Sequence, residues 1–98
     1  MKKIPPFKLH PIPLSNEAAC LPKFKWANDD VGSRHKLGGS PDFIQSEDIP
    51  ICDDCGELMT FYAQLDSIND DYCIADCGMI YTFVCFQCNT VKSIIQSG

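Results

Sequence analysis

Seven cysteines stand out in this chain of 98 residues, and four of them form two Cys-x-x-Cys pairs. The first pair is Cys52 and Cys55, and the second is Cys85 and Cys88. Each pair can offer two thiolates to one metal ion from a tight turn, and four thiolates complete the tetrahedron that structural zinc prefers. The spacing is typical of a zinc ribbon and predicts one structural Zn²⁺ bound by these four residues.

The residues that follow the two pairs favour the same interpretation. Gly56 follows Cys55 and Asn89 follows Cys88, and both residue types tolerate the left-handed backbone that turns amides toward sulfur. Four protein ligands leave no coordination position for water or substrate. We therefore expect a site that holds the fold together and performs no chemistry.

A disulfide framework is the rival use of so many cysteines. The odd cysteine count, the metal-ligand spacing and a start at Met1 that does not read as a secretory signal argue against it. The expected compartment is the cytoplasm. Cys20 is expected in the core. Cys73 and Cys77 are expected to be buried free thiols, with metal or disulfide bonding as open alternatives.

Other groups that could perform catalysis form no convincing set. His10 lies among prolines and His35 lies between two basic residues, with no matched nucleophile for either. The adjacent acids Asp53-Asp54 and Asp70-Asp71 would point apart in an extended chain. No glycine-rich phosphate loop is present. The sequence predicts a protein that is not an enzyme.

The C-terminal half has the pattern of a small antiparallel sheet. Residues 59–65 alternate with a period of two, which predicts a half-buried strand. Residues 79–86 are apolar on both faces, as in a central strand, and residues 90–96 supply a third strand. Residues 66–71 read as a polar turn. The apolar face of the first strand is predicted to consist of Met59, Phe61, Ala63 and Leu65.

The N-terminal part lacks these patterns. Four prolines in residues 1–14 predict an irregular extended arm. Ser15 can cap one helical turn, and Gly38-Gly39 can take positive φ or admit another backbone. We expect one mainly β domain over residues 1–98, with arm and loops in 1–33 and a zinc-stapled β region in 34–98. The arm is expected to pack through Ile4, Phe7, Leu9, Ile12 and Leu14.

Charge limits the classes of partner. Eight basic against thirteen acidic residues give a net charge of −5, and four thiolates on one Zn²⁺ add about −2. Ten of the acids lie between residues 42 and 76, where no basic residue occurs. A negative surface repels nucleic acid and attracts basic proteins. No apolar run approaches the ~20 residues that span a bilayer, so no membrane association is expected.

Three segments carry a family resemblance. The "GG-x-P-x-aromatic-x-Q" segment at residues 38–45, the "F-x-A-Q-hydrophobic-D" strand at 61–66 and the "D-x-G" strand at 76–83 resemble the YwqG-like family. The zinc-knuckled arrangement is also similar to programmed-cell-death-2-like proteins. The match covers about residues 34–98, although this chain is far shorter than typical members. Some members are associated with bacterial toxins, which implies an immunity protein.

Together these features predict a structural-zinc protein that acts by binding a basic protein. The resemblance implies that this partner is a bacterial toxin, which the protein would neutralise as an immunity protein. The expected contact residues are Asp70, Asp71, Tyr72 and Phe86. The alternative is a nucleic-acid-binding zinc ribbon. In that case the phosphate contacts would come from Lys23, Lys25, Arg34, His35 and Lys36.

Overall fold

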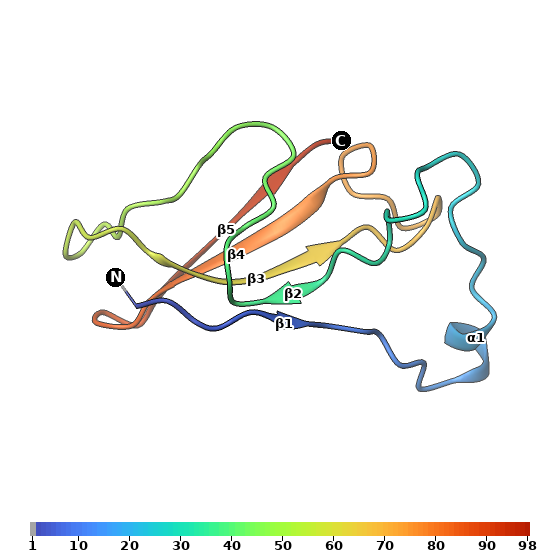
Figure 1. The fold of residues 1–98 in the computed structure, drawn as a ribbon, viewed down its shortest axis with the longest axis horizontal. Helices are drawn as coiled ribbons and strands as arrows, with labels where there is room; N and C mark the ends of the chain where they lie inside the picture. Colours follow the sequence, from blue (N-terminus) through green and yellow to red (C-terminus); the bar gives the residue numbers. More distant parts are fainter. Residues whose placement is uncertain (1) are drawn as a thin grey trace.

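A computed structural model describes residues 2–98 and shows one five-stranded antiparallel sheet in the order β1-β2-β3-β4-β5 (Figure 1). The prediction of a mainly β protein is confirmed. A single helical turn, α1 (Asn16–Ala19), begins after Ser15, whose side chain accepts a hydrogen bond from the Ala18 N–H as predicted. The strands are β1 (Phe7–Lys8), β2 (Lys36–Leu37), β3 (Thr60–Asp66), β4 (Met79–Cys85) and β5 (Thr90–Gln96).

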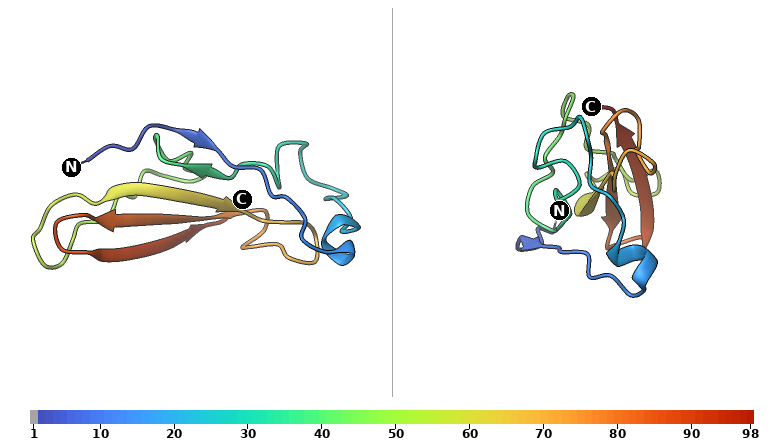
Figure 2. Two further views of the ribbon diagram at one scale, coloured as in Figure 1. Left: turned by 90° about the horizontal axis from the view of Figure 1, so that it is seen from below. Right: turned by 90° about the vertical axis from the view of Figure 1, so that its right-hand side faces the viewer.

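The three long strands β3, β4 and β5 lie side by side, with the short β1 and β2 at one edge (Figure 2). β4 is the central strand of this group and pairs along its whole length with β5. Its odd-numbered residues are buried and form the centre of the core, because side chains alternate between the two faces of a strand. These residues are Met79, Tyr81, Phe83 and Cys85.

The segment between β2 and β3 covers the core face of the sheet. The ring of Phe43 packs on Tyr81 with centroids 5.1 Å apart, and Phe61 meets Phe83 edge-on at 5.7 Å. Ile44 and Ile49 pack against the same cluster. The hydrophobic core therefore lies between one face of β3–β5 and this covering segment.

A β-bulge at Tyr62 changes the pattern of β3. Phe61 pairs with Phe83 and Ala63 with Thr82, so Tyr62 is an extra residue without its own partner. An extra residue reverses the faces beyond it, because the side-chain period is two. The prediction that Leu65 faces the core is therefore wrong: Gln64 is buried and Leu65 is 49% exposed.

Asp66 is also placed differently from the prediction. It was expected to open a polar turn, but it is the last residue of β3 and is buried. The other strand boundaries agree with the predicted ranges to within one residue, and β5 agrees at both ends. The polar connection starts at Ser67 instead.

The N-terminal arm contacts the sheet over a short length. β1 pairs with β2 at its outer edge, and Gly38 and Gly39 both have positive φ, as predicted. A Cβ on Gly38 would lie 2.5 Å from the Pro5 carbonyl oxygen, so glycine lets the arm approach. Ile4 and Leu9 are half-buried. The prediction that the whole arm packs is wrong for Phe7, Ile12 and Leu14, which are exposed.

No helix within residues 2–98 is long and apolar enough to cross a membrane.

Gly78, immediately before β4, gives a direct test of the packing. A Cβ at this position would collide with the backbone oxygen of Gln96 and approach that of Ile74. Backbone atoms of paired strands move only with distortion of the sheet, so we expect Gly78→Ala to lower the free energy of unfolding by about 2–3 kcal/mol. Urea denaturation of the metal-loaded protein measures this change.

Gly56→Ala is the matched control. No atom lies within 4 Å of a Cβ on Gly56, so only its positive φ of 75° opposes alanine. The expected cost is about 1 kcal/mol. An equal or smaller loss for Gly78→Ala would contradict the packing described here.

Candidate metal centre

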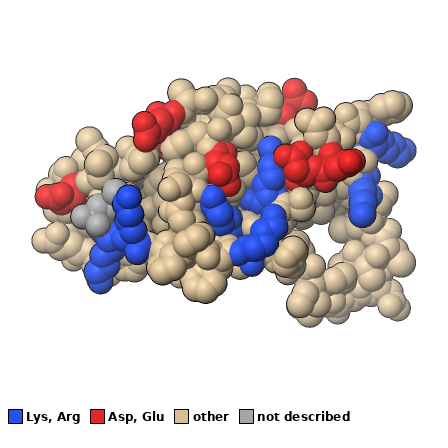
Figure 3. All heavy atoms as spheres, viewed as in Figure 1, with Lys and Arg blue, Asp and Glu red and all other residues tan. Residues whose placement is uncertain are grey.

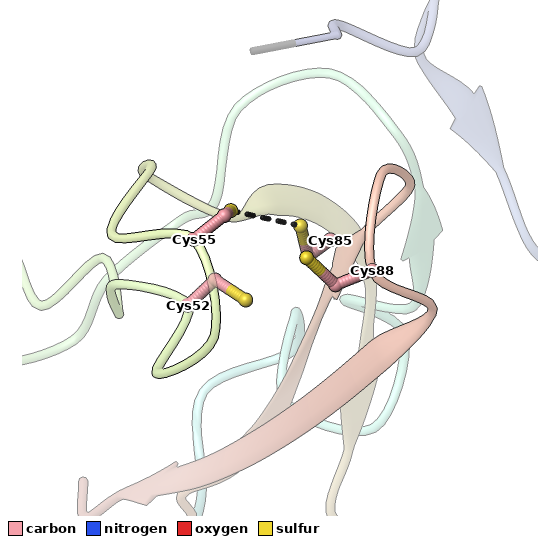
Figure 4. A group of neighbouring side chains, drawn as sticks. All are labelled: Cys52, Cys55, Cys85 and Cys88. Atoms are coloured by element: carbon pink, nitrogen blue, oxygen red, sulfur yellow. Dashed lines mark hydrogen bonds between the residues drawn. The ribbon is translucent and has the colours of Figure 1, made fainter.

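Four cysteines from two distant parts of the chain meet at one end of the sheet (Figure 4). Cys52 and Cys55 lie in the turn before β3, Cys85 ends β4, and Cys88 lies in the turn that leads to β5. Their sulfur atoms point toward one another, and all lie within 4.8 Å of each other. The two predicted pairs are therefore brought together into one cluster.

The two turns that present the sulfurs are equivalent. The Gly56 N–H donates to the Cys52 carbonyl at 2.8 Å, and the Asn89 N–H donates to the Cys85 carbonyl at 2.8 Å. Gly56 and Asn89 have φ values of 75° and 57°, as predicted for the residue that follows each pair. Glycine and asparagine take this left-handed conformation at low cost. The local sequence thus accounts for both turns.

The spacing of the sulfurs fits a tetrahedral ion. Metal–sulfur bonds of ~2.3 Å in a regular tetrahedron place the sulfurs about 3.8 Å apart. The Cys55 and Cys85 sulfurs are 3.7 Å apart. Cys52 and Cys85 are buried, and the other two cysteines are half-buried. The cluster can hold one metal ion with four sulfur ligands.

The pKa values of the clustered thiols also favour the binding of a cation. Backbone N–H groups of Cys55 and Asp54 point at the Cys52 sulfur and lower the pKa of that thiol to about 6. The neighbouring Cys55 thiol, together with burial, raises the pKa of Cys88 to about 12. Four thiolates in contact repel one another, whereas a bound cation releases their protons and neutralises that repulsion.

Thr90 and Asp54 surround the cluster. The Thr90 hydroxyl lies 3.8 Å from the Cys52 sulfur and donates to the Asp54 carboxylate at 3.1 Å. Lys92 pairs with Asp53 at 3.1 Å across the same turn. The Thr90 and Asp54 side chains are placed to orient the Cys52 ligand and to anchor the turn to β5, whereas the Lys92–Asp53 pair is an exposed contact outside the cluster.

The residues predicted to bind a partner do not lie together. Asp70, Asp71 and Tyr72 lie in the connection between β3 and β4, whereas Phe86 lies in the turn after β4. A strand of seven residues, about 23 Å long, separates the two places. All four are exposed, and Lys2 lies over the Phe86 ring at 5.3 Å.

The basic residues of the nucleic-acid alternative are largely engaged within the protein. Arg34 pairs with Asp66 at 2.7 Å and Lys36 pairs with Asp42 at 2.8 Å. His35 is buried, and its Nδ1 accepts a hydrogen bond from the Asp66 N–H. Basic side chains do gather on the face that carries β1 and β2 (Figure 3). Three of the five proposed phosphate contacts nevertheless already have internal partners.

The remaining cysteines are more exposed than predicted. Cys20 lies at the end of α1 and is exposed, so its expected place in the core is wrong. Cys73 is also exposed, and Cys77 is half-buried. Neither belongs to the four-sulfur cluster. His10 is exposed.

Sequence reasoning missed a buried polar network next to the core. The Asp66 carboxylate, with no exposed side-chain surface, accepts hydrogen bonds from the Gly32 N–H, the Arg34 N–H and the Arg34 guanidinium at 2.7–3.0 Å. Gln64 donates to the Arg34 carbonyl and to the Asp42 carboxylate. The signal in the sequence that could have revealed this network is the presence of two polar residues, Gln64 and Asp66, at the end of an otherwise apolar strand.

The polar network contains residues of the three segments that resemble the YwqG-like family. The Gln and Asp of the "F-x-A-Q-hydrophobic-D" strand are Gln64 and Asp66, both of which are buried and hydrogen-bonded. The Tyr81 hydroxyl donates to the Asp42 carbonyl at 2.8 Å, which joins the other two segments. These residues hold the covering segment and the loop before β2 onto the sheet.

Comparisons with known proteins give a distant relative. No protein-family model matches the chain, and no solved structure matches it. The chain is 38% identical over 64 residues to "uncharacterized protein YpfL" of Salmonella typhimurium strain LT2. The match covers 62% of this chain and 14% of that protein, so the chain corresponds to a small part of a much longer relative.

Proposed function

We propose that this protein is a zinc-stapled binding domain that attaches to a basic protein through the outer face of β3–β5. The observation that carries the proposal is an exposed, uncharged sheet face with two apolar rows, on a sheet whose end connections are acidic. Zinc holds the sheet in shape and takes no part in chemistry.

The four-sulfur cluster supports zinc as the metal. Tetrahedral sulfur sites suit Zn²⁺ or iron, while hard cations such as Mg²⁺ and Ca²⁺ prefer oxygen ligands. Thiolates from two tight turns close the coordination shell, and this closed arrangement is that of structural zinc. The donor set therefore fits Zn²⁺, and Cys52, Cys55, Cys85 and Cys88 would hold it.

The outer face consists of the side chains of β3–β5 that point away from the core. Cross-strand pairing places Leu65, Ile80 and Ile95 in one row and Val84 beside Val91 in another. Leu65, Ile95 and Val91 are 49%, 58% and 60% exposed. Ala63, Thr82 and Ser93 form the row between them, and the two hydroxyls lie 3.0 Å apart. Exposed apolar surface of this kind marks an interaction site in many proteins.

Charge selects the kind of partner. No outward-pointing side chain of β3–β5 is charged. The connections at both ends of the sheet are acidic, with Asp53, Asp54 and Glu57 near the metal turn and Asp70, Asp71 and Asp76 in the opposite connection, all exposed. Acidic residues near an uncharged binding face steer a basic partner toward it.

The resemblance to the YwqG-like family extends this proposal to a toxin-neutralising role. A basic toxin with a nucleic-acid-binding cleft is the kind of protein that an acidic surface can occupy. The net charge of −5 is consistent with this role. The absence of a convergent catalytic set in the sequence led us to expect a protein that is not an enzyme, and the proposal retains that expectation.

Affinity purification with the zinc-loaded protein tests the proposal. Nuclease-treated extract of the source cells is passed over the immobilised protein, and the purified captured protein is then titrated calorimetrically. We expect a basic protein whose affinity falls about tenfold or more with Ile95→Lys, because a charge then lies in the apolar row that Ile95 forms with Ile80 and Leu65. The control is Leu14→Lys, which makes the same kind of change at a residue 96% exposed and outside the face.

Two results would contradict the proposal. Equal partner affinities for Ile95→Lys and the wild type would exclude the outer face as the binding surface. Retention of single- or double-stranded nucleic acid with a strong salt dependence would favour the zinc-ribbon alternative. Circular dichroism and zinc content establish that each variant is folded.

A further inference from the structure

A second pair of thiols lies at the opposite end of β4 from the metal cluster. Cys73 and Cys77 belong to the connection between β3 and β4, which spans residues 67–78. The Cys77 N–H donates to the Cys73 sulfur at 2.9 Å, so the chain folds back and brings residue 77 over residue 73. Cys73 is exposed, whereas Cys77 is half-buried.

The backbone of this turn is unusual. Ala75, Asp76 and Cys77 have φ values of 43°, 58° and 63°, three consecutive left-handed residues that all carry a Cβ. Such residues rarely adopt this conformation, and runs of them are rarer still. The surrounding structure must therefore hold the turn in place.

Several hydrogen bonds do hold it. The fully buried Ser67 hydroxyl accepts from the Ile74 N–H at 2.9 Å and donates to the Gly78 carbonyl at 2.7 Å. Arg34 donates to the Cys77 carbonyl at 2.8 Å, and the Gly98 N–H donates to the Ala75 carbonyl at 3.1 Å. The two cysteines are thus positioned near each other before any reaction between them.

We propose that Cys73 and Cys77 form a reversible disulfide when the protein meets a peroxide. Their contact through the Cys77 N–H, the accessibility of Cys73 and the anchored turn carry this inference. The site lies at the opposite end of β4 from the metal cluster, in the connection that also carries Asp70, Asp71 and Asp76. It is a redox-modification site in the connection between β3 and β4.

The reaction takes two steps. The Cys73 thiolate attacks one oxygen of hydrogen peroxide and breaks the O–O bond, which gives Cys73 sulfenic acid and, after protonation of the leaving hydroxide, water. The Cys77 sulfur, having lost its proton, then attacks the Cys73 sulfur, and a second water leaves with the sulfenic oxygen. Overall, two thiols and one peroxide give one disulfide and two waters. Two equivalents of a thiol reductant reverse the reaction.

The environment of each thiol supports this order of events. Cys73 is exposed and can meet the oxidant first. Burial, followed by the neighbouring Cys73 thiol, raises the pKa of Cys77, which favours its protonated form until the second step. Cys20 lies after α1, outside this connection. In the zinc-loaded protein the four clustered thiolates are metal ligands.

Mass spectrometry of the zinc-loaded protein tests the inference. The reduced protein is treated with an equal concentration of hydrogen peroxide, alkylated without reduction and digested. The expected product is a peptide containing Cys73 and Cys77 that is lighter by two hydrogen atoms and carries no alkyl group. Dithiothreitol should restore both alkylation sites while zinc stays bound.

Variants separate the roles of the two thiols. Cys77→Ser is expected to accumulate Cys73 sulfenic acid, which dimedone traps, and Cys73→Ser should give neither product. Cys20→Ser should behave as the wild type. Full alkylation of Cys73 and Cys77 after peroxide treatment, linkage of either to another cysteine, or loss of zinc before they react would overturn the inference.

Discussion

Removal of the metal by a chelator at neutral pH is expected to unfold β3, β4 and β5. Zinc binding to four-cysteine sites contributes an apparent ~10–16 kcal/mol near neutral pH, which is comparable with the whole stability of a domain of this size. The four sulfurs join the turn before β3 to both ends of the β4–β5 turn. Circular dichroism should show a large loss of β-structure, and elemental analysis should give about one zinc per chain.

Single ligand substitutions should act in the same direction. Cys52→Ser and Cys85→Ser each remove a buried ligand, and we expect zinc affinity to fall by at least tenfold and thermal unfolding to shift to lower temperature. Cys20→Ser is the matched control, because Cys20 is exposed and lies outside the cluster. It should leave zinc content and stability unchanged within about 0.5 kcal/mol.

Two experimental outcomes would contradict or correct the assignment of the metal. A protein that stays folded and metal-free in excess chelator would show that the four thiols do not need an ion. Iron in place of zinc, with the visible absorption of an iron–thiolate site, would correct the identity of the metal while keeping its ligands. Addition of Zn²⁺ to the chelated protein should restore the circular dichroism signal if the effect is that of the metal alone.

The parts of the structure that sequence reasoning predicted depend on local signals. The Cys-x-x-Cys spacing and the residues Gly56 and Asn89 specify two turns whose geometry needs no distant contact. The composition and length of residues 90–96 were enough to predict the strand β5. Local chemistry of this kind can be interpreted from a single sequence.

The errors arise where distant contacts decide the structure. The bulge at Tyr62 has no composition signal of its own, yet it reverses the faces of Gln64 and Leu65. Asp66 reads as a turn residue until Arg34, far away in the sequence, supplies its partner. Tertiary contacts of these kinds override local propensity.

Asp66→Asn is expected to destabilise the metal-loaded protein by about 3–5 kcal/mol. The carboxylate is fully buried and is the acceptor for four hydrogen bonds from Gly32 and Arg34. Burial opposes the charge of Asp66, but the Arg34 and backbone donors outweigh it and hold the pKa of this carboxyl below its usual value. Removal of one partner from a buried ion pair leaves the other charge uncompensated. Urea denaturation with saturating zinc measures the loss.

Lys92→Gln is the control for a simple ion pair. Lys92 and Asp53 form a contact of similar length, but their side chains are 32% and 82% exposed. Exposed pairs of this kind contribute about 0–1 kcal/mol, so the variant should unfold close to the wild type. Similar losses of unfolding free energy for Asp66→Asn and Lys92→Gln would show that the burial of Asp66 does not increase its contribution to stability.

A double-mutant cycle separates the pair from the rest of the network. If Asp66 acts mainly through Arg34, then Arg34→Gln should cost much less in the Asp66→Asn background than in the wild type, with a coupling free energy above about 1 kcal/mol. Additive losses would instead assign the effect to the Gly32 and Arg34 backbone donors, which remain in both variants. Strong coupling would identify the Arg34–Asp66 pair as the link that fastens the loop before β2 to the end of β3. The same link reaches the Cys73–Cys77 turn through the Cys77 carbonyl.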